Sequence, residues 1–400
     1  MIKKVCLNLV LGILLSGSLQ AQSTLLTTDL IKFDFNVLAK NKIRINHKDD
    51  ALMPAYIQLL KDAEKSIKFK PVSVMDKTDF PPSGNKHDYM SIAPYWWPDP
   101  SKPNGVPYIK RDGEVNPEVA NFPDKESFPK LIRNIHTLSL AYYFSGQEKY
   151  AAHANKLLEV WFLDSATKMN PNLNYGQAVK GVIDGRAEGV IDTRHFAYLI
   201  DAINLLKGSK SFTAHNHTEL KKWFSEFLSW LQTSKIGVKE MNAKNNHGVW
   251  FDAQSLAIAL FIDSTNLADK IVNRTLNRLD KQMDEKGMFL LELERTTSLH
   301  YSVFIMNAFE IVAQLSEKTK TDFWTAKTAS GKTFKQAFDA INPYLTDKKK
   351  WEYKQITEYG YEDGINLLLR ASYRYNCKTC KDDINYIAKQ DYIKQLFNLL

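Results

Sequence analysis

The sequence predicts an all-α protein, an incomplete α/α barrel (α/α toroid) of antiparallel helical hairpins with one long irregular loop. Apolar residues recur with the 3.6-residue helical period over most of the chain, and the alternation typical of strands is scarce. Short polar breaks separate neighbouring periodic segments, which is typical of antiparallel hairpins. The segment 80–129 breaks the period, because its ten prolines make regular helix nearly impossible. An irregular segment of this length inside a compact domain is usually functional.

The N-terminal residues 1–21 have the features of a secretory signal peptide. Two lysines precede an apolar stretch (5–15), and the residues ending at Ala21 form an acceptable cleavage site. The apolar stretch is too short to span a bilayer. We expect an exported protein, periplasmic in a Gram-negative host, without membrane insertion. Because no linker composition divides the mature chain, we expect residues 22–400 to form a single toroid domain.

Charge and cysteine content bound the class of protein further. The chain has 53 Lys and Arg against 45 Asp and Glu, a net charge of +8. This excess favours a polyanionic partner, although many soluble proteins carry a similar charge. Beyond the signal, the cysteines are Cys377 and Cys380, which could close a small disulfide loop in an oxidising compartment. No further Cys or His lies near enough in sequence to suggest a zinc site.

The predicted helices follow the apolar period in order. The strongest is 130–144, where Leu131, Ile135, Leu138 and Tyr142 share one stripe. The others are 53–69, 149–162, 193–206, 219–231, 249–262, 267–283, 298–315, 334–344, 364–375 and 383–399.

Two breaks in the helical pattern carry candidate binding residues. The first holds Tyr95, Trp96 and Trp97, whose aromatic faces could line a glycan groove or could pack the loop onto the body. The second, 170–192, holds Arg186 among other polar residues. Its guanidinium could bind a substrate carboxylate or form a structural ion pair with an Asp or Glu.

A cluster of polar side chains stands directly before the apolar stretch 250–262. It consists of Asn245, Asn246 and His247. Asn is a favoured helix N-cap, and Gly248 is expected to let the backbone turn tightly. These polar groups should therefore lie at a helix N-terminus.

A second polar cluster follows about fifty residues later, again before an apolar helix. It includes Arg295, His300 and Tyr301, and the hydroxyl residues 296–298 can cap the following helix. This places Arg295 before the helix and Tyr301 in its first turns. We expect the two helix N-termini to face each other and form an active site.

The motifs of several other chemistries are absent. No G-x-S-x-G elbow, G-x-G-x-x-G turn or H-E-x-x-H helix occurs, and no phosphate loop matches fully. Glu292 and Glu294 are a candidate glycosidase pair. However, alternate positions on one segment give no reason to expect the separation across a cleft that a glycosidase needs.

β-Elimination from a uronic acid fits the polar clusters better. Donors must neutralise the uronate carboxylate, a base must take the C5 proton, and an acid must protonate the departing glycosidic oxygen. Tyrosine can serve as base or acid if a nearby cation lowers its pKa from about 10. Asn246, His247, Arg295 and Tyr301 supply these groups. The chemistry requires no metal or organic cofactor.

These features resemble the alginate lyase families that have an α/α toroid fold. The resemblance covers about His87 to Tyr301 and rests on the Asn-Asn-His cluster, the aromatic loop and the Arg and Tyr that follow. It implies that Asn246 and Arg295 neutralise the carboxylate, that His247 is a neutraliser or the base, and that Tyr301 is base and acid. The spacing between Arg and Tyr is one residue shorter than in the better-known periplasmic alginate lyases, which indicates a sister family.

The resemblance implies an acidic polysaccharide as the partner, alginate first, with no nucleic acid and no obligate protein partner evident. The alternatives are a lyase for another polyuronate, such as glucuronan, and a non-catalytic exported glycan-binding protein. His136, His300 and Tyr301 could each instead be structural. The candidate substrate-binding residues are Asn245, His300, Tyr95, Trp96, Trp97, Tyr175, Gln177, Arg186 and His136.

Overall fold

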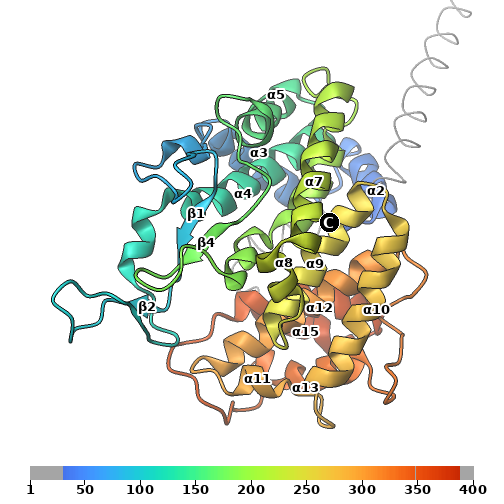
Figure 1. Ribbon diagram of the computed structural model, residues 1–400. Helices are drawn as coiled ribbons and strands as arrows, with labels where there is room; N and C mark the ends of the chain where they lie inside the picture. Colours follow the sequence, from blue (N-terminus) through green and yellow to red (C-terminus); the bar gives the residue numbers. More distant parts are fainter. Residues whose placement is uncertain (1–29, 347, 388–400) are drawn as a thin grey trace, which may run out of the picture.

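Helices make up most of the structure, a computed structural model that describes residues 30–346 and 348–387 (Figure 1). The all-α prediction is confirmed. Within the described residues, no helix is both long and apolar enough to cross a membrane. The predicted signal peptide (1–21) and the end of the helix expected at 383–399 lie outside the described residues.

The predicted helices are present with small shifts at their ends. Three further helices, α2, α8 and α11, were not predicted. The helices are α2 (Phe35–Asn46), α3 (Met53–Ser66), α4 (Pro123–Ser145), α5 (Glu148–Leu158), α6 (Phe196–Leu205), α7 (Ala214–Thr233), α8 (Lys235–Met241), α9 (Asn246–Phe261), α10 (Thr265–Gln282), α11 (Leu290–Leu293), α12 (Ser298–Ser316), α13 (Phe334–Leu345), α14 (Ile365–Arg374) and α15 (Lys378–Ile387). Shorter helical segments are η1 (Val74–Asp76), η2 (Pro117–Asn121), η3 (Glu159–Leu163), η4 (Ala187–Thr193) and η5 (Tyr361–Gly364).

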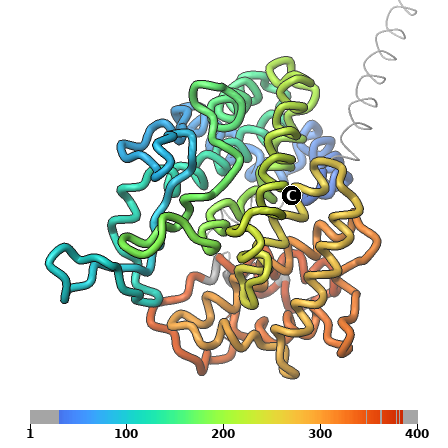
Figure 2. The backbone as a smooth tube through the Cα atoms, viewed as in Figure 1, coloured from blue at the N-terminus to red at the C-terminus, as the bar shows by residue number. Residues whose placement is uncertain are grey.

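Neighbouring helices pack as hairpins around α9, as the chain trace shows (Figure 2). Helix α9 packs against α6, α7, α10 and α12, and nearly all of its residues are buried. At the α4–α5 turn, Gly146 adopts a φ of +68° and its N–H bonds to the Tyr142 carbonyl, a left-handed helix end that glycine favours. Most buried apolar side chains from Leu30 to Ile384 form one core cluster. The N-terminus of α9 is therefore held by the core of the molecule.

The proline-rich segment 80–129 is less irregular than predicted. It contributes three short strands to two small sheets: β1 (Met90–Ile92) runs parallel to β4 (Tyr175–Ala178), and β2 (Trp96–Trp97) runs antiparallel to β3 (Ile109–Lys110). The β1–β4 pair brings the two breaks of the helical pattern side by side (Figure 1).

The expectation that helix is excluded up to residue 129 is wrong for the last seven residues. Helix α4 begins at Pro123, where a missing N–H costs no intrahelical bond. Pro129 lies inside the helix and removes one backbone donor. The buried stripe that contains Phe128 and Leu131 offsets this loss, because both side chains are fully buried.

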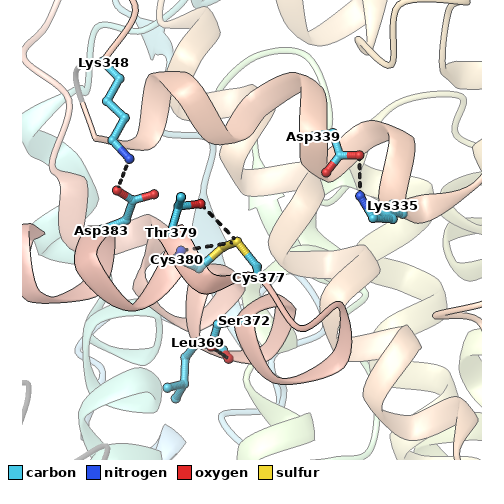
Figure 3. The surroundings of a disulfide bond; sticks show 9 residues. All are labelled: Lys335, Asp339, Lys348, Leu369, Ser372, Cys377, Thr379, Cys380 and Asp383. Atoms are coloured by element: carbon cyan, nitrogen blue, oxygen red, sulfur yellow. Dashed lines mark hydrogen bonds and ion pairs between the residues drawn. A yellow bond between two sulfur atoms is a disulfide. The ribbon is translucent and has the colours of Figure 1, made fainter.

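The disulfide that the sequence left open is present between Cys377 and Cys380, where α14 passes into α15 (Figure 3). Cys380 is buried, and its backbone N–H points at the Cys377 sulfur at 3.2 Å. In the following turn, Asp383 forms an ion pair with Lys348. The bond therefore acts as a local clip for the C-terminal helices.

Candidate active site

A cavity of about 660 Å³ opens where the N-termini of α9 and α12 meet the base of the β2–β3 loop and the segment before α6. The two helix N-termini therefore face one cavity, as predicted from the sequence. The predicted residues that line it are Tyr95, Trp96, Gln177, Arg186, Asn245, Asn246, His247, Arg295, His300 and Tyr301.

The first turn of α9 holds Asn246 in a fixed orientation. Asn245 is the N-cap, and its side chain accepts from the His247 N–H at 3.3 Å. The backbone N–H and the Nδ2 of Asn246 both donate to the Glu292 carboxylate at 2.7 Å. The Asn246 Oδ1 is buried and has no partner among the described residues. Burial raises the pKa of Glu292, and the two Asn246 donors oppose this shift.

Gly248 does not make a tight turn, so that expectation is wrong. It lies inside α9, and a Cβ atom there would stand 2.5 Å from Nη1 of Arg278 and 2.3 Å from the Ala243 carbonyl oxygen. Arg278 in turn donates to that carbonyl at 2.8 Å and to the Asp252 carboxylate at 2.7 Å. The glycine is needed because a guanidinium packs against its backbone.

His247 is paired with a buried carboxylate. Its Nδ1 lies 2.6 Å from Oε1 of Glu240, a residue of α8 that is only 2% exposed. Burial works to lower the pKa of His247, but the charge and hydrogen bond of Glu240, with the charge of Glu188, outweigh it, so the pKa is raised. Arg186 opposes the increase. Because Glu240 occupies Nδ1, Nε2 is the ring nitrogen left for a ligand.

Arg295 is already bound by a carboxylate of the proline-rich segment. Its Nε and Nη2 donate to the two oxygens of Asp112 at 3.1 and 2.7 Å, a bidentate pair. The guanidinium also lies 3.6 Å from the centroid of the Tyr301 ring. Arg295 therefore lines the cavity, and its guanidinium interacts with both the Asp112 carboxylate and the Tyr301 ring.

The hydroxyl residues before α12 do not cap it as predicted. Thr297 is the N-cap residue, but its side chain makes no capping hydrogen bond. Thr296 Oγ1 donates to the Asp112 carbonyl at 3.1 Å, and Ser298 Oγ donates to the Lys354 carbonyl at 2.6 Å. These two hydroxyls therefore bind carbonyls of neighbouring loops and hold those loops at the start of α12.

Tyr301 is buried, with 8% of its surface exposed, and its hydroxyl donates to the Tyr95 hydroxyl at 3.0 Å. Burial raises the pKa of Tyr301 well above its usual value, while the charge of Arg295 pulls it down. The sequence suggested that a nearby cation would lower this pKa. The cation is present, but burial dominates, so Tyr301 is a neutral phenol.

Two of the three aromatic residues of the predicted loop line the cavity. Tyr95 and Trp96 do so, whereas Trp97 donates its Nε1–H to the Glu114 carbonyl at 2.9 Å, and Arg111 lies 5.1 Å from its ring centroid. Trp97 thus packs within its own loop.

Tyr175 also lies outside the cavity lining, in the strand β4 that pairs with β1. Arg186 donates to Oε1 of Gln177 at 2.9 Å and lies 3.5 Å from Glu188. The Gln177 Nε2 donates to Asp192 at 3.1 Å. The structural ion pair, one of the two alternatives for Arg186, is therefore present.

The two further candidate histidines line an adjoining cavity. His136 lines an adjoining cavity, 5.5 Å from the Phe33 ring, and burial lowers its pKa to about 4. His300 lies between the two cavities, stacked on Phe304 with ring centroids 6.1 Å apart and 3.5 Å from Asp363.

Four charged residues of this site were not identified from the sequence: Asp112, Arg194, Glu240 and Glu292. Glu292 was considered only as part of a carboxylate pair. The other three belong to no motif, and Asp112 lies 183 positions from the arginine that it binds. The residues Arg111, Asp112 and Gly113 indicate a turn in the sequence. A turn, however, does not identify the residue that Asp112 binds.

The fold and this cavity together define an α/α toroid of the polysaccharide lyase class. The chain belongs to the alginate lyase family, since residues 73–351 match the model of that family. The resemblance seen in the sequence is thus confirmed, as is the prediction of a lyase.

Solved structures agree with this assignment. An alginate lyase from Bacteroides ovatus is 38% identical, with 93% of this chain and 99% of that chain covered and a TM-score of 0.88. Alginate lyase A1-III from Sphingomonas species A1 is 15% identical, with 81% and 89% covered and a TM-score of 0.50, and shows the shared fold. A comparison with curated protein sequences finds no match.

Proposed function

We propose that this protein cleaves 1,4-linked polyuronate, alginate first, by β-elimination and leaves a 4,5-unsaturated uronate at the new non-reducing end. The observation that carries the proposal is the convergence of Asn246, His247, Arg295 and Tyr301 on one cavity. The similarity to the Bacteroides ovatus alginate lyase over nearly the whole chain supports alginate as the substrate.

Asn246 is proposed to neutralise the uronate carboxylate. Glu292 accepts from the backbone N–H and from one Nδ2 hydrogen, so the amide is oriented before substrate binds, and the second Nδ2 hydrogen is the donor left for the uronate carboxylate. The residue lies in the first turn of α9, where the positive end of the helix dipole favours a negative group. Negative charge that develops as the C5 proton leaves is stabilised at the same place.

His247 is proposed as the base. Glu240 accepts the Nδ1–H, which fixes the tautomer and leaves the lone pair of Nε2 for the C5 proton. The imidazolium that then forms is stabilised by the Glu240 carboxylate, as in other paired carboxylate–imidazole bases.

Tyr301 is proposed as the acid. As a neutral phenol it can donate its proton to the departing glycosidic oxygen, and the Arg295 guanidinium over its ring stabilises the phenolate that remains. In the complete step the C5–H and C4–O bonds break and the C4–C5 double bond forms. His247 holds the C5 proton and the leaving oxygen carries the Tyr301 proton, so transfer between them through water restores both residues.

The other lining residues are proposed to hold neighbouring sugars. Tyr95 and Trp96 offer aromatic faces at the base of the β2–β3 loop, and Arg186 is close to Trp96, with its guanidinium carbon 6.0 Å from the ring centroid. We further propose export through the signal peptide 1–21, most simply to the periplasm, and a single lyase domain formed by residues 22–400 that needs no protein partner.

Replacement of Tyr301 by Phe tests the proposal. We expect Tyr301→Phe to lower the formation of unsaturated uronate from alginate by at least about a hundredfold, because the proton donor is lost. Alginate binding, measured by calorimetry, should stay within a few-fold. The exposed Tyr373→Phe is the matched control and should leave both unchanged.

Two outcomes would decide against this assignment. Undiminished turnover in Tyr301→Phe would remove Tyr301 from the reaction. Alginate binding without any elimination by the unsubstituted protein would favour the alternative of a non-catalytic glycan-binding protein.

A further inference from the structure

A second cavity of about 610 Å³ adjoins the active-site cavity. The two share Arg194, His300 and Phe304 in their linings. One face of α12 runs past both: His300 and Phe304 line both cavities, and Asn307 on the same face lines the second, about 10 Å from His300 along the helix axis at 1.5 Å per residue. A chain that leaves the catalytic residues along α12 therefore enters the second cavity.

Arg194, at the junction, carries an uncompensated charge. Among the residues that the structure describes, no carboxylate lies within ion-pair distance of its guanidinium. Its contacts are the Ile191 carbonyl, at 3.3 Å from Nη1, and the Phe304 ring, at 5.8 Å from the guanidinium carbon. Burial lowers the pKa of Arg194, and Asp192 opposes this only in part. A half-buried guanidinium of this kind is costly unless an anion binds to it.

Three other cations of the active-site cavity have a carboxylate nearby. Arg295 is bound by Asp112, Arg186 lies near Glu188, and Lys125 lies 3.6 Å from Asp192. Arg194 therefore differs from Arg186 and Arg295, the other two guanidiniums of the active-site cavity, because no carboxylate of the described residues lies within ion-pair distance of it.

Three polar atoms on the wall of the second cavity are buried and have no hydrogen-bond partner in the described part of the chain. They are Nε1 of Trp250, Oδ1 of Asn307 and Oε1 of Glu310. Trp250 is 5% exposed and Glu310 is 1% exposed. Burial raises the pKa of Glu310, which favours the protonated form, a hydrogen-bond donor. Buried polar groups are normally paired, so these atoms point to a hydroxyl-rich ligand.

We propose that the second cavity is a further uronate-binding site of the groove, in which Arg194 binds the carboxylate of a sugar adjacent to the one that is cleaved. The Phe304 ring and the stacked His300 form one wall for the sugar, and Trp250 and Asn307 take its hydroxyl groups. The inference rests on the proposed function, because it takes the substrate to be a chain of uronates.

The test measures binding of saturated alginate oligosaccharides by calorimetry in the Tyr301→Phe background, where cleavage is blocked. We expect Arg194→Gln to weaken tetrasaccharide binding by at least about tenfold, because a charge-assisted hydrogen bond is lost. A disaccharide, which cannot occupy both cavities fully, should lose less. Arg194→Lys should recover part of the affinity, and Arg44→Gln, at a surface pair with Asp49 outside both cavities, should change nothing.

The melting temperature without ligand separates binding from structure. Because Arg194 is an uncompensated charge, Arg194→Gln should melt no lower than its parent. Tetrasaccharide affinity within twofold of the parent, or weaker binding with a lower melting temperature, would overturn the proposal.

The two proposals fail in different ways. Elimination by the unsubstituted protein with Arg194-independent binding would remove the second site alone. Arg194-dependent binding without elimination would remove the lyase function alone.

Discussion

The charge of His247 depends on the groups packed around it. Glu240 of α8, Glu188 of η4 and Glu292 of α11 face it with negative charge, and Arg186 faces it with positive charge. Glu240 is the carboxylate in direct contact. Glu240 therefore strongly influences the pH at which the His247 imidazole is unprotonated and can accept a proton.

We predict that Glu240→Gln shifts the acidic limb of the pH profile of kcat/KM to lower pH. Gln can still accept the Nδ1–H, but the charge that raises the His247 pKa is gone. A base acts when unprotonated, so activity rises with pH through its pKa, and a lower pKa moves that rise to lower pH. If His247 instead bound the substrate as an imidazolium, the profile would fall with pH at this pKa, which contradicts the proposed role.

Gly248 gives a prediction about stability. Gly248→Ala should lower the free energy of unfolding by about 1–3 kcal/mol, because the added methyl group collides with Arg278 and the Ala243 carbonyl. Urea unfolding measures the change. Ser225→Ala, at an exposed position of α7, is the control and should change stability by less than about 0.5 kcal/mol. An equally small change in Gly248→Ala would show that the packing around Arg278 relaxes freely.

At the scale of elements, the proline-rich segment supports the start of α12. Asp112 binds Arg295, the Asp112 carbonyl accepts from Thr296, and Tyr95 accepts from Tyr301. The loop beyond β2 extends from the helical body (Figure 2), while its base closes the cavity. The proline-rich segment therefore contributes residues to the active site and also closes one side of the cavity.

We predict that Asp112→Asn lowers kcat by at least about tenfold, because the bidentate ion pair that aligns Arg295 over Tyr301 is lost. KM should change less, since Arg295 is assigned to the Tyr301 phenolate rather than to substrate binding. Steady-state kinetics checks this. Asp99→Asn, at a partly exposed position of the same segment that does not line the cavity, is the control. A rise in KM at constant kcat would instead assign Arg295 to the substrate carboxylate.

The C-terminal disulfide, in contrast, gives a prediction in which activity does not change. Replacing both Cys377 and Cys380 by Ser should cost about 2 kcal/mol or less, because the bond closes a very short loop. Activity should be unchanged, since neither residue lines the cavity. Thermal melting with and without reductant, together with initial rates, measures both. A loss of activity without a loss of stability would show that α14 and α15 influence the groove.

For the whole molecule, sequence patterns predicted the long helices because ten or more residues display the helical period. The helices α8 and α11 were missed because seven and four residues are too few to display it. Helix α2 has twelve residues and was also missed, because only Leu38 and Ile45 among its buried residues are apolar. The two polar clusters predicted the helix N-termini of the active site. For α9 the reason was correct, since Asn245 caps the helix, whereas the hydroxyl residues before α12 make no capping hydrogen bond.

The residues that hold the catalytic groups could not be predicted in the same way. Glu240 and Glu292 reach α9 from other elements, and Asp112 lies 183 positions before Arg295 in the chain. Each of these carboxylates meets its partner only in the folded structure, so its place in the sequence does not reveal the contact. Arg194 was missed because its distinguishing property is the absence of an ionic partner within the described residues, which no sequence pattern reveals.

The measurement that tests the central claim most directly is the ultraviolet absorbance of conjugated unsaturated uronate when the mature chain is mixed with alginate, with glucuronan and pectate in parallel. The proposal predicts a steady rise with alginate whose rate Tyr301→Phe lowers by at least about a hundredfold. A rise only with another polyuronate would keep the mechanism and replace the substrate. No rise with any of the three polymers, despite binding, would contradict the claim that this protein is an active lyase.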